Sequence, residues 1–181
     1  VPLYLALNRS LNLAMVNLGV TLGLEEVQKQ FELLTGRKPR NQFPSFLLGA
    51  EPMSPIEVSE LYSNFASGGF NLKPKTVIGV LDSAGAPLSH HSIVLKQTIN
   101  PVISNTLNRS LELTMRRGTG RFSSFAKSGV AGKTGTTNDN RDSWFAGFDD
   151  NKLAVFWVGR DDNKSTGLSG ASGALKLWDA S

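Results

Sequence analysis

Three short segments near the end of the chain decide its fold: Val130-Ala-Gly-Lys-Thr-Gly-Thr-Thr137, Ser143-Trp-Phe-Ala-Gly-Phe148 and Leu153-Ala-Val-Phe-Trp-Val158. The second and third are rich in aromatic and β-branched residues, and the polar stretch Asp149-Asp-Asn-Lys152 separates them. This pattern predicts an antiparallel hairpin. The first segment is predicted to form a third strand of the same sheet.

Upstream of these strands, helical periodicity prevails. Apolar residues recur at three- and four-residue steps over residues 3–34, where Gly19 and Gly23 are expected to interrupt the helix. The stretch Ser54-Pro-Ile-Glu57 combines an N-cap serine, a first-turn proline and a glutamate three residues after the cap. It predicts a helix that ends at Gly68, since glycine readily takes the left-handed conformation at a helix end.

The remaining segments complete an α+β pattern. A strand is predicted over residues 76–81, a helix from Asn100 to Gly118, and a short final helix within residues 169–179. The order is helices, then a sheet, then a helix, which predicts an α+β domain with an antiparallel sheet flanked by helices.

Composition excludes several classes of function. The chain has 181 residues, of which 40% are hydrophobic and 19% charged, so it can bury a core of its own. It has no cysteine and two histidines, His90 and His91, which excludes thiolate chemistry and a cysteine- or histidine-rich metal site. The net charge of +4 comes from scattered residues without interleaved aromatic side chains, so nucleic acid is not an expected partner. No cofactor is expected.

The string Gly132-Lys-Thr-Gly-Thr-Thr137 contains residues that could bind a ligand if the segment forms a strand. Lys133 and Thr134 point to opposite faces of a flat strand, so both reach one ligand only if the strand twists or lies at an edge. Gly135 allows a substrate backbone to lie close to the strand, and Thr136 adds a hydroxyl and an N–H group. By itself, the string fits an ordinary edge strand with a solvated lysine equally well.

A second string, Ser10-Leu-Asn12, lies upstream of the first, and the two are informative in combination. Together and in this order they resemble two of the three motifs of the penicillin-recognising serine acyltransferases, Ser-x-x-Lys, Ser-x-Asn and Lys-Thr-Gly. The chain resembles the bifunctional, class A penicillin-binding proteins most, through segments spread over most of its length: Phe46–Ala50, Met53–Glu57, Asn64–Gly69, Arg117–Arg121, Trp144–Gly147 and Trp157–Asp162.

The resemblance implies a β-lactamase/transpeptidase-like fold and a peptidoglycan transpeptidase, with stem peptides and β-lactams as ligands. Ser10 would pass a proton to the leaving amine and Asn12 would hold the substrate amide. Lys133 would keep a positive field near the substrate carboxylate, which the hydroxyls of Thr134 and Thr136 would bind beside Gly135. The Thr136 N–H would be one of two oxyanion-hole donors.

The third motif departs from the family pattern. Ser-x-x-Lys should precede Ser10, but only nine residues do so. The one literal match, Ser124-Phe-Ala-Lys127, follows Ser10 in a serine- and glycine-rich connection and is not expected to be the nucleophile. Residues 1–181 are therefore expected to be the C-terminal part of a single transpeptidase domain. Its first strands, nucleophile helix, membrane anchor and glycosyltransferase domain would lie upstream, and the fragment alone is expected to be inactive.

Other activities remain open from these residues. A D-Ala-D-Ala carboxypeptidase or a serine β-lactamase would carry the same strings, because the reactions differ only in what accepts the acyl group. A non-catalytic penicillin-binding sensor or interaction module is an alternative of another class. The resemblance alone places the domain on the periplasmic face of the cytoplasmic membrane, where other cell-wall synthesis proteins are possible partners.

Overall fold

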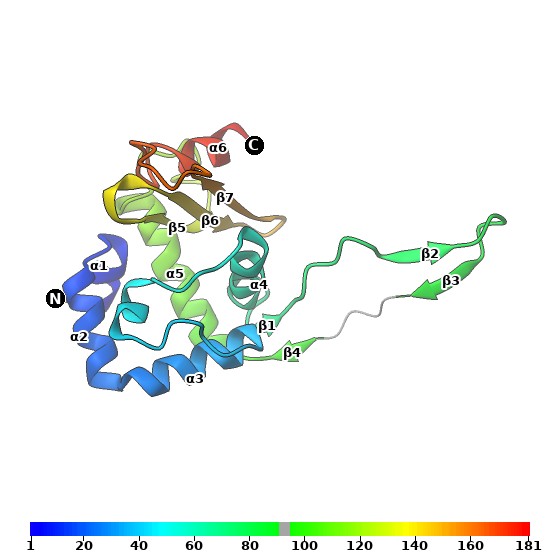
Figure 1. Ribbon diagram of the computed structural model, residues 1–181, viewed down its shortest axis with the longest axis horizontal. Coiled ribbons are helices and arrows are strands. Elements are labelled where there is room, and N and C mark those ends of the chain that lie inside the picture. Colours follow the sequence, from blue (N-terminus) through cyan, green and yellow to red (C-terminus); the bar gives the residue numbers. More distant parts are fainter. Residues whose placement is uncertain (91–94) are drawn as a thin grey trace.

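The computed structural model describes residues 1–90 and 95–181 (Figure 1). The helices are α1 (Leu3–Asn8), α2 (Asn12–Leu22), α3 (Leu24–Thr35), α4 (Pro55–Ala66), α5 (Pro101–Arg117) and α6 (Ala174–Ala180), with 3-10 turns η1 (Pro44–Leu48) and η2 (Asn138–Asn140). The strands are β1 (Phe70–Asn71), β2 (Gly79–Leu81), β3 (Pro87–His90), β4 (Lys96–Gln97), β5 (Ala131–Thr136), β6 (Ser143–Phe148) and β7 (Leu153–Val158). No helix in the described ranges is both long enough and apolar enough to cross a membrane.

The three predicted strands form one antiparallel sheet in the order β5-β6-β7. Thr134 pairs with Phe145, which pairs in turn with Phe156. The Asp149 side chain closes the turn between β6 and β7 by accepting hydrogen bonds from the N–H groups of residues 151 and 152, at 2.8 and 2.9 Å. Strand β5 lies at an edge of this sheet, which is the condition that lets neighbouring side chains reach a common ligand.

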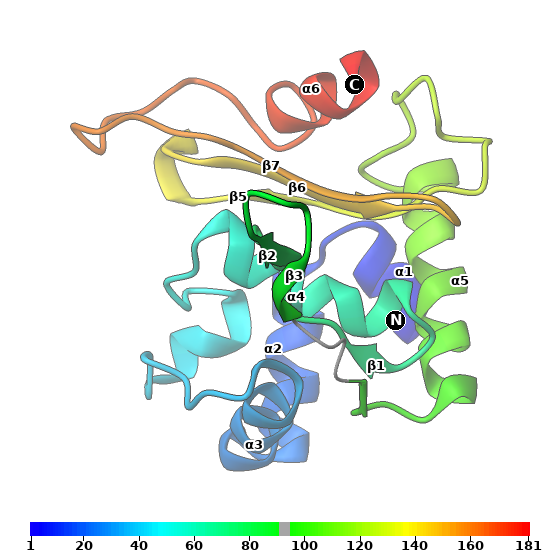
Figure 2. The ribbon, with the colours of Figure 1, turned by 90° about the vertical axis from the view of Figure 1, so that its right-hand side faces the viewer.

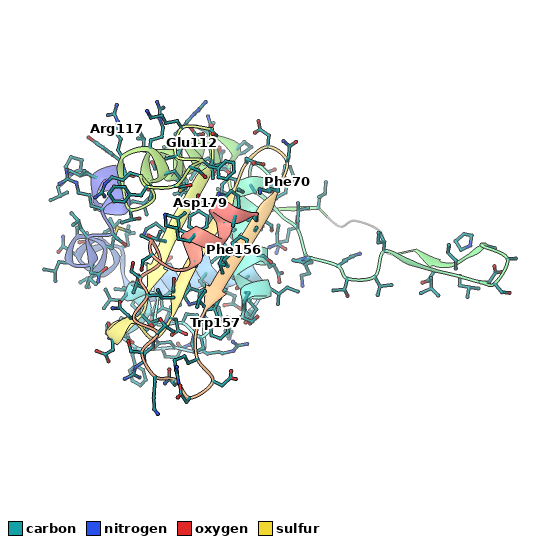
Figure 3. The ribbon with its side chains drawn as sticks, turned by 90° about the horizontal axis from the view of Figure 1, so that it is seen from above. Phe70, Glu112, Arg117, Phe156, Trp157 and Asp179 are labelled. Atoms are coloured by element: carbon teal, nitrogen blue, oxygen red, sulfur yellow. The ribbon has the colours of Figure 1, made fainter. Side chains whose placement is uncertain are left out.

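Helices cover both faces of the sheet (Figure 2). On one face Phe145 is fully buried against Trp178 of α6, with ring centroids 5.4 Å apart. Figure 3, seen from above, shows Phe156 of β7 beneath the same helix. On the other face, Ala131 and Phe148 pack against Leu111 of α5. Because alternate residues of each strand face opposite layers, the sheet is fixed in register by two separate apolar contacts.

The helical segment over residues 3–34 breaks at an unexpected place. Gly23 separates α2 from α3 as predicted, but Gly19 lies inside α2, where a Cβ would lie 2.5 Å from a methyl group of Leu47. The other break lies between α1 and α2, at residues 9–11. Gly19 therefore serves close packing, and the chain turns instead at the Ser10 string.

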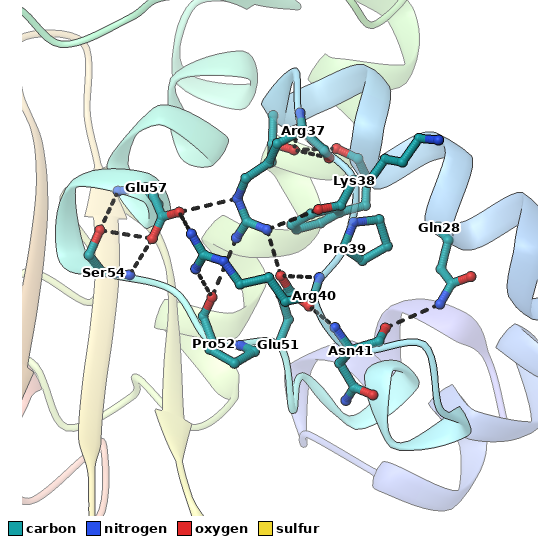
Figure 4. Close-up of polar contacts among 12 residues, drawn as sticks. Gln28, Arg37, Lys38, Pro39, Arg40, Asn41, Glu51, Pro52, Ser54 and Glu57 are labelled. Atoms are coloured by element: carbon teal, nitrogen blue, oxygen red, sulfur yellow. Dashed lines mark hydrogen bonds and ion pairs between the residues drawn. The ribbon is translucent and has the colours of Figure 1, made fainter.

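A network of arginine and glutamate residues holds the loop between α3 and α4 (Figure 4). Arg37 donates to Glu51 at 2.7 Å, and Arg40 donates to Glu57 at 2.9 Å. Glu57 also completes the predicted capping box with Ser54. Hydrogen bonds from Ser54 and from Arg40 lower the pKa of Glu57 to about 2, so this carboxylate stays charged at neutral pH.

Residues 73–90, named the arm here, project away from the rest of the chain (Figure 1). The strand predicted over residues 76–81 is shorter in the structure, Gly79–Leu81, and pairs only with β3. Residues 76–81 are mostly apolar, yet Ile78 is 83% exposed, and Leu88 of β3 is 67% exposed. The apolar pattern of the arm has no covering layer within the described residues.

Candidate active site

Ser10 lies at the turn that ends α1. The N–H of Ser10 donates to the Leu7 carbonyl and the N–H of Leu11 donates to the Ala6 carbonyl, at 3.1 and 2.9 Å, which is the bonding pattern of a Schellman cap. Ser10 occupies the left-handed position of this cap, with φ of 54°, where glycine is usual. A serine at this position costs stability but directs a hydroxyl from the helix end.

The Ser10 hydroxyl meets Lys133 of β5. The Lys133 ammonium donates to Ser10 Oγ at 2.7 Å, although 123 positions separate the two residues in sequence. The ammonium also donates to the Thr134 carbonyl at 2.9 Å and makes no ion pair with any described carboxylate. Burial lowers the pKa of Lys133 to about 8. The two strings, which lie far apart in sequence, therefore meet in the fold.

Thr119 joins the same group of residues. Its hydroxyl accepts a hydrogen bond from the Thr134 hydroxyl at 2.6 Å, and its N–H donates to the Asn8 carbonyl at 3.1 Å. Gly118 makes this approach possible, because a Cβ there would lie 2.3 Å from the Asn8 carbonyl oxygen. Sequence reasoning noted the stretch Arg117–Arg121 but assigned Thr119 no role. The adjoining glycines, which allow close backbone approach, were the available signal.

Thr136 and Gly135 lie at the far end of β5, where the loop before α6 crosses the strand. The N–H of Gly170 donates to the Thr136 hydroxyl at 2.9 Å. A Cβ on Gly170 would lie 2.5 Å from the Gly135 carbonyl oxygen. The Thr136 hydroxyl accepts this bond and so keeps its proton for a ligand. Its side chain is exposed, which leaves that proton accessible.

Asn12 is the predicted site residue that the structure does not connect to Lys133. It is the first residue of α2, is exposed, and makes no side-chain hydrogen bond with any described residue. The Ser10 turn determines this, because the sharp break directs residue 10 toward β5 and the next helix starts from Asn12. The role of Asn12 therefore stays a prediction.

Ser124, the only literal nucleophile match, lies in a series of turns between α5 and β5. Its hydroxyl donates to the Asp179 carboxylate of α6 at 3.3 Å, and Lys127 is exposed. Activation of a serine needs a base that accepts its proton. Asp179 is labelled in Figure 3, at the α6 layer. Across the described ranges, no three histidine, cysteine or acidic side chains gather as a metal site would require.

The geometry therefore gathers a half-buried ammonium, three hydroxyls and an edge strand. Comparison with known protein families decides what this group is: residues 3–176 match the family model of the penicillin-binding protein transpeptidase domain. The chain belongs to this family. Family membership confirms the resemblance on which the site residues were chosen, and the α+β fold with an antiparallel sheet is the fold of its structural neighbours.

Curated relatives are class A penicillin-binding proteins. The chain is 38% identical to penicillin-binding protein 1B of Vibrio cholerae over 181 residues, covering 98% of this chain and 23% of that protein. It is 37% identical to penicillin-binding protein 1B of Escherichia coli, covering 96% of this chain and 21% of that protein. The chain thus spans less than a quarter of the length of these relatives.

Solved structures agree on the fold. Penicillin-binding protein 1A from Haemophilus influenzae superposes with a TM-score of 0.89 at 24% identity, covering 98% of this chain and 33% of that one. The PonA1 protein from Mycobacterium tuberculosis, solved in complex with penicillin V, gives a TM-score of 0.82 at 20% identity and covers 98% of this chain and 54% of that one. At these identities the likeness establishes architecture.

Proposed function

We propose that residues 1–181 form the C-terminal part of one transpeptidase domain in a longer, bifunctional penicillin-binding protein. The observation that carries this proposal is the 2.7 Å hydrogen bond from Lys133 to Ser10, which joins two motifs that lie far apart in sequence. The share of the curated relatives that the chain covers, 23% for the protein from Vibrio cholerae, supports a longer parent protein. The parent is proposed to face the periplasm from a membrane anchor.

The reaction is the transfer of a peptidyl group between stem peptides through a serine ester. A nucleophilic serine gives its proton to the lysine of its own Ser-x-x-Lys motif and attacks the carbonyl of the penultimate D-Ala, and the terminal D-Ala leaves as an amine that needs a proton. Because Lys133 donates to Ser10 Oγ, the proton of the Ser10 hydroxyl is free to be donated elsewhere. Ser10 would give this proton to the leaving amine and take one from Lys133, and the acceptor amine would reverse the transfer.

The carboxylate of the substrate would bind at β5. Lys133 has one N–H left after its bonds to Ser10 and Thr134, and the Thr136 hydroxyl keeps its proton. Both can donate to one anion at the edge of the sheet, while the backbone at Gly135 admits a peptide. β-Lactams present a carboxylate beside a reactive carbonyl, so they would occupy the same place. The Thr136 N–H would stabilise the oxyanion, an effect of about 3 kcal/mol for such a donor.

Intact-mass spectrometry after incubation with penicillin tests the proposal. The full-length protein should gain one penicillin, attached to a serine outside residues 1–181. Residues 1–181 alone should gain none, because Ser10 accepts a hydrogen bond from the Lys133 ammonium and the Ser124 hydroxyl bonds the Asp179 carboxylate and not a lysine. A full-length protein that stays unmodified would contradict the proposed function, and an adduct at Ser124 would contradict the assignment of the nucleophile.

A further inference from the structure

A cavity lined by arginine adjoins the candidate active site. It has a volume of about 360 Å³ and is lined by Arg9, Arg117, Gly118, Thr119 and Arg121. Arg9 is the chain neighbour of Ser10, and the hydroxyl of Thr119 bonds to that of Thr134. The cavity therefore shares its wall with both motif strings. In Figure 3 Arg117 lies on the side of the body opposite the arm.

The charges in this cavity are uncompensated by the described part of the chain. Arg9, Arg117 and Arg121 make no ion pair there, whereas every other arginine of the described residues except Arg116 does so. Arg121 is held in place by a bond to the Gly118 carbonyl at 3.2 Å and by stacking on Phe122 at 4.2 Å. Three guanidinium groups around one cavity favour an anion as the ligand.

The floor of the cavity is rigid. The Thr119 N–H donates to the carbonyl of Asn8, the buried last residue of α1, and Gly118 lies directly against the same carbonyl. A Cβ on Gly120 would lie 2.5 Å from the Met115 sulfur, so the loop cannot shift inward. The backbone contacts between residues 8 and 118–119 thereby bring Arg9 and Arg117, which are far apart in sequence, to the wall of one cavity.

We propose that this arginine-lined cavity binds a carboxylate of a peptide substrate, separate from the carboxylate proposed to bind at Lys133 and Thr136. The inference rests on the proposed function, because it places a second anionic group of the same substrates beside the reacting bond. Carboxylate fits best, since carboxylates are the anionic groups of a peptide and a guanidinium binds one through two parallel hydrogen bonds. The carboxylate can belong to the donor or to the acceptor peptide.

The experiment compares acidic and neutral substrates on the full-length protein. In the acceptor arm of the experiment, D-glutamate and D-glutamine, which differ only in a side-chain carboxylate, compete with water for the acyl group of a D-Ala-D-Ala donor. In the donor arm, the donor peptide carries either a side-chain carboxylate or its amide. In the arm of the experiment whose carboxylate binds in the cavity, the acidic compound should be used about tenfold or more faster than its amide. This factor corresponds to about 1.4 kcal/mol. The arm that shows the preference identifies the source of the carboxylate.

Variants then locate the preference. Arg117→Gln should bring the acid-to-amide ratio close to one, and Arg117→Lys should keep part of it because the charge remains. Arg116→Gln is the matched control, since Arg116 is an exposed neighbour that does not line the cavity. Equal use of acid and amide by the parent in both arms would overturn the inference. An equal loss in Arg116→Gln would overturn it too, because a general positive field would then explain the ratio.

Penicillin acylation of the parent protein separates the two proposals. A parent that penicillin acylates but that does not distinguish acid from amide leaves the proposed function intact and removes the second carboxylate site. A parent that penicillin does not acylate contradicts the proposed function itself.

Discussion

The sheet β5-β6-β7 and the arm are both built of antiparallel strands, but they are stabilised in different ways. Each face of the sheet is covered, by α6 on one side and by α1, α4 and α5 on the other. Among the residues that the structure describes, strands β2 and β3 of the arm pair only with each other, and they have exposed apolar side chains. Two-stranded ribbons are marginally stable in water. The candidate site lies on β5, a strand of the sheet that the surrounding helices hold in position.

The largest effect is expected from the core that holds β6. Phe145→Ala removes a ring with no exposure that packs on Trp178 and fills the space above Gly132 and Gly147. It should lower the free energy of unfolding by about 3–5 kcal/mol. Denaturant unfolding of the full-length protein, followed by tryptophan fluorescence, would measure this. A loss below about 1 kcal/mol would show that the sheet does not depend on its α6 face.

Lys133→Ala is expected to have the next largest effect, on chemistry rather than stability. It removes the partner of Ser10 and the charge proposed to bind the substrate carboxylate, so acylation by a fluorescent penicillin should slow by about a hundredfold or more. Lys127→Ala is the matched control, because Lys127 is an exposed lysine six residues earlier in the chain. An acylation rate of Lys133→Ala within a few-fold of the parent would remove Lys133 from the mechanism.

Prediction from sequence succeeded for elements whose apolar residues are buried by neighbouring elements. The three strands of the sheet, the capping box at Ser54 and helix α5 appear where the pattern indicates, because local preference and burial agree there. The arm differs, because a short apolar run predicts a strand on the assumption that its side chains are buried. The sequence shows the apolar residues but not the missing layer, so β2 is shorter than expected.

The candidate site could be predicted only in part, because some of its residues belong to short motifs and others are brought in by contacts between distant segments. Lys133 and Ser10 were found from short strings, and their contact follows from the break after α1. That break was misplaced at Gly19, because a serine in the left-handed position has no local sequence signal. Thr119 and the arginine-lined cavity depend on contacts between α1 and the end of α5, which no local pattern describes.

The pH dependence of acylation tests whether the charge of the Lys133 side chain on β5 controls the binding of a β-lactam. Burial lowers the pKa of Lys133 to about 8, so its ammonium loses its proton as pH rises through that value. If the ammonium binds the carboxylate of a β-lactam, the second-order acylation rate should fall above pH 8 by up to tenfold per pH unit. The rate measured from pH 6.5 to 9.5 decides this. A rate that rises over the same range would assign Lys133 the role of a base.

A smaller effect is expected at the cap of α1. Ser10→Gly relieves the left-handed conformation and should raise the free energy of unfolding by about 1 kcal/mol. The same change removes the hydroxyl bound to Lys133 and should slow acylation. Ser10→Ala provides the control, because it removes the hydroxyl and keeps the strain. A Ser10→Gly variant that is no more stable than Ser10→Ala would show that the cap stores no strain.

The smallest effect is expected in the arm, at Ile78. Its side chain is 83% exposed, so truncation removes little apolar surface from a packed contact. Ile78→Ala should change the free energy of unfolding by less than about 0.5 kcal/mol and leave penicillin acylation unchanged, in contrast to Phe145→Ala in the sheet. Denaturant unfolding of both variants under the same conditions gives the comparison. A loss of 2 kcal/mol or more in Ile78→Ala would mean that the arm packs against another part of the full-length protein, because only a buried isoleucine loses that much.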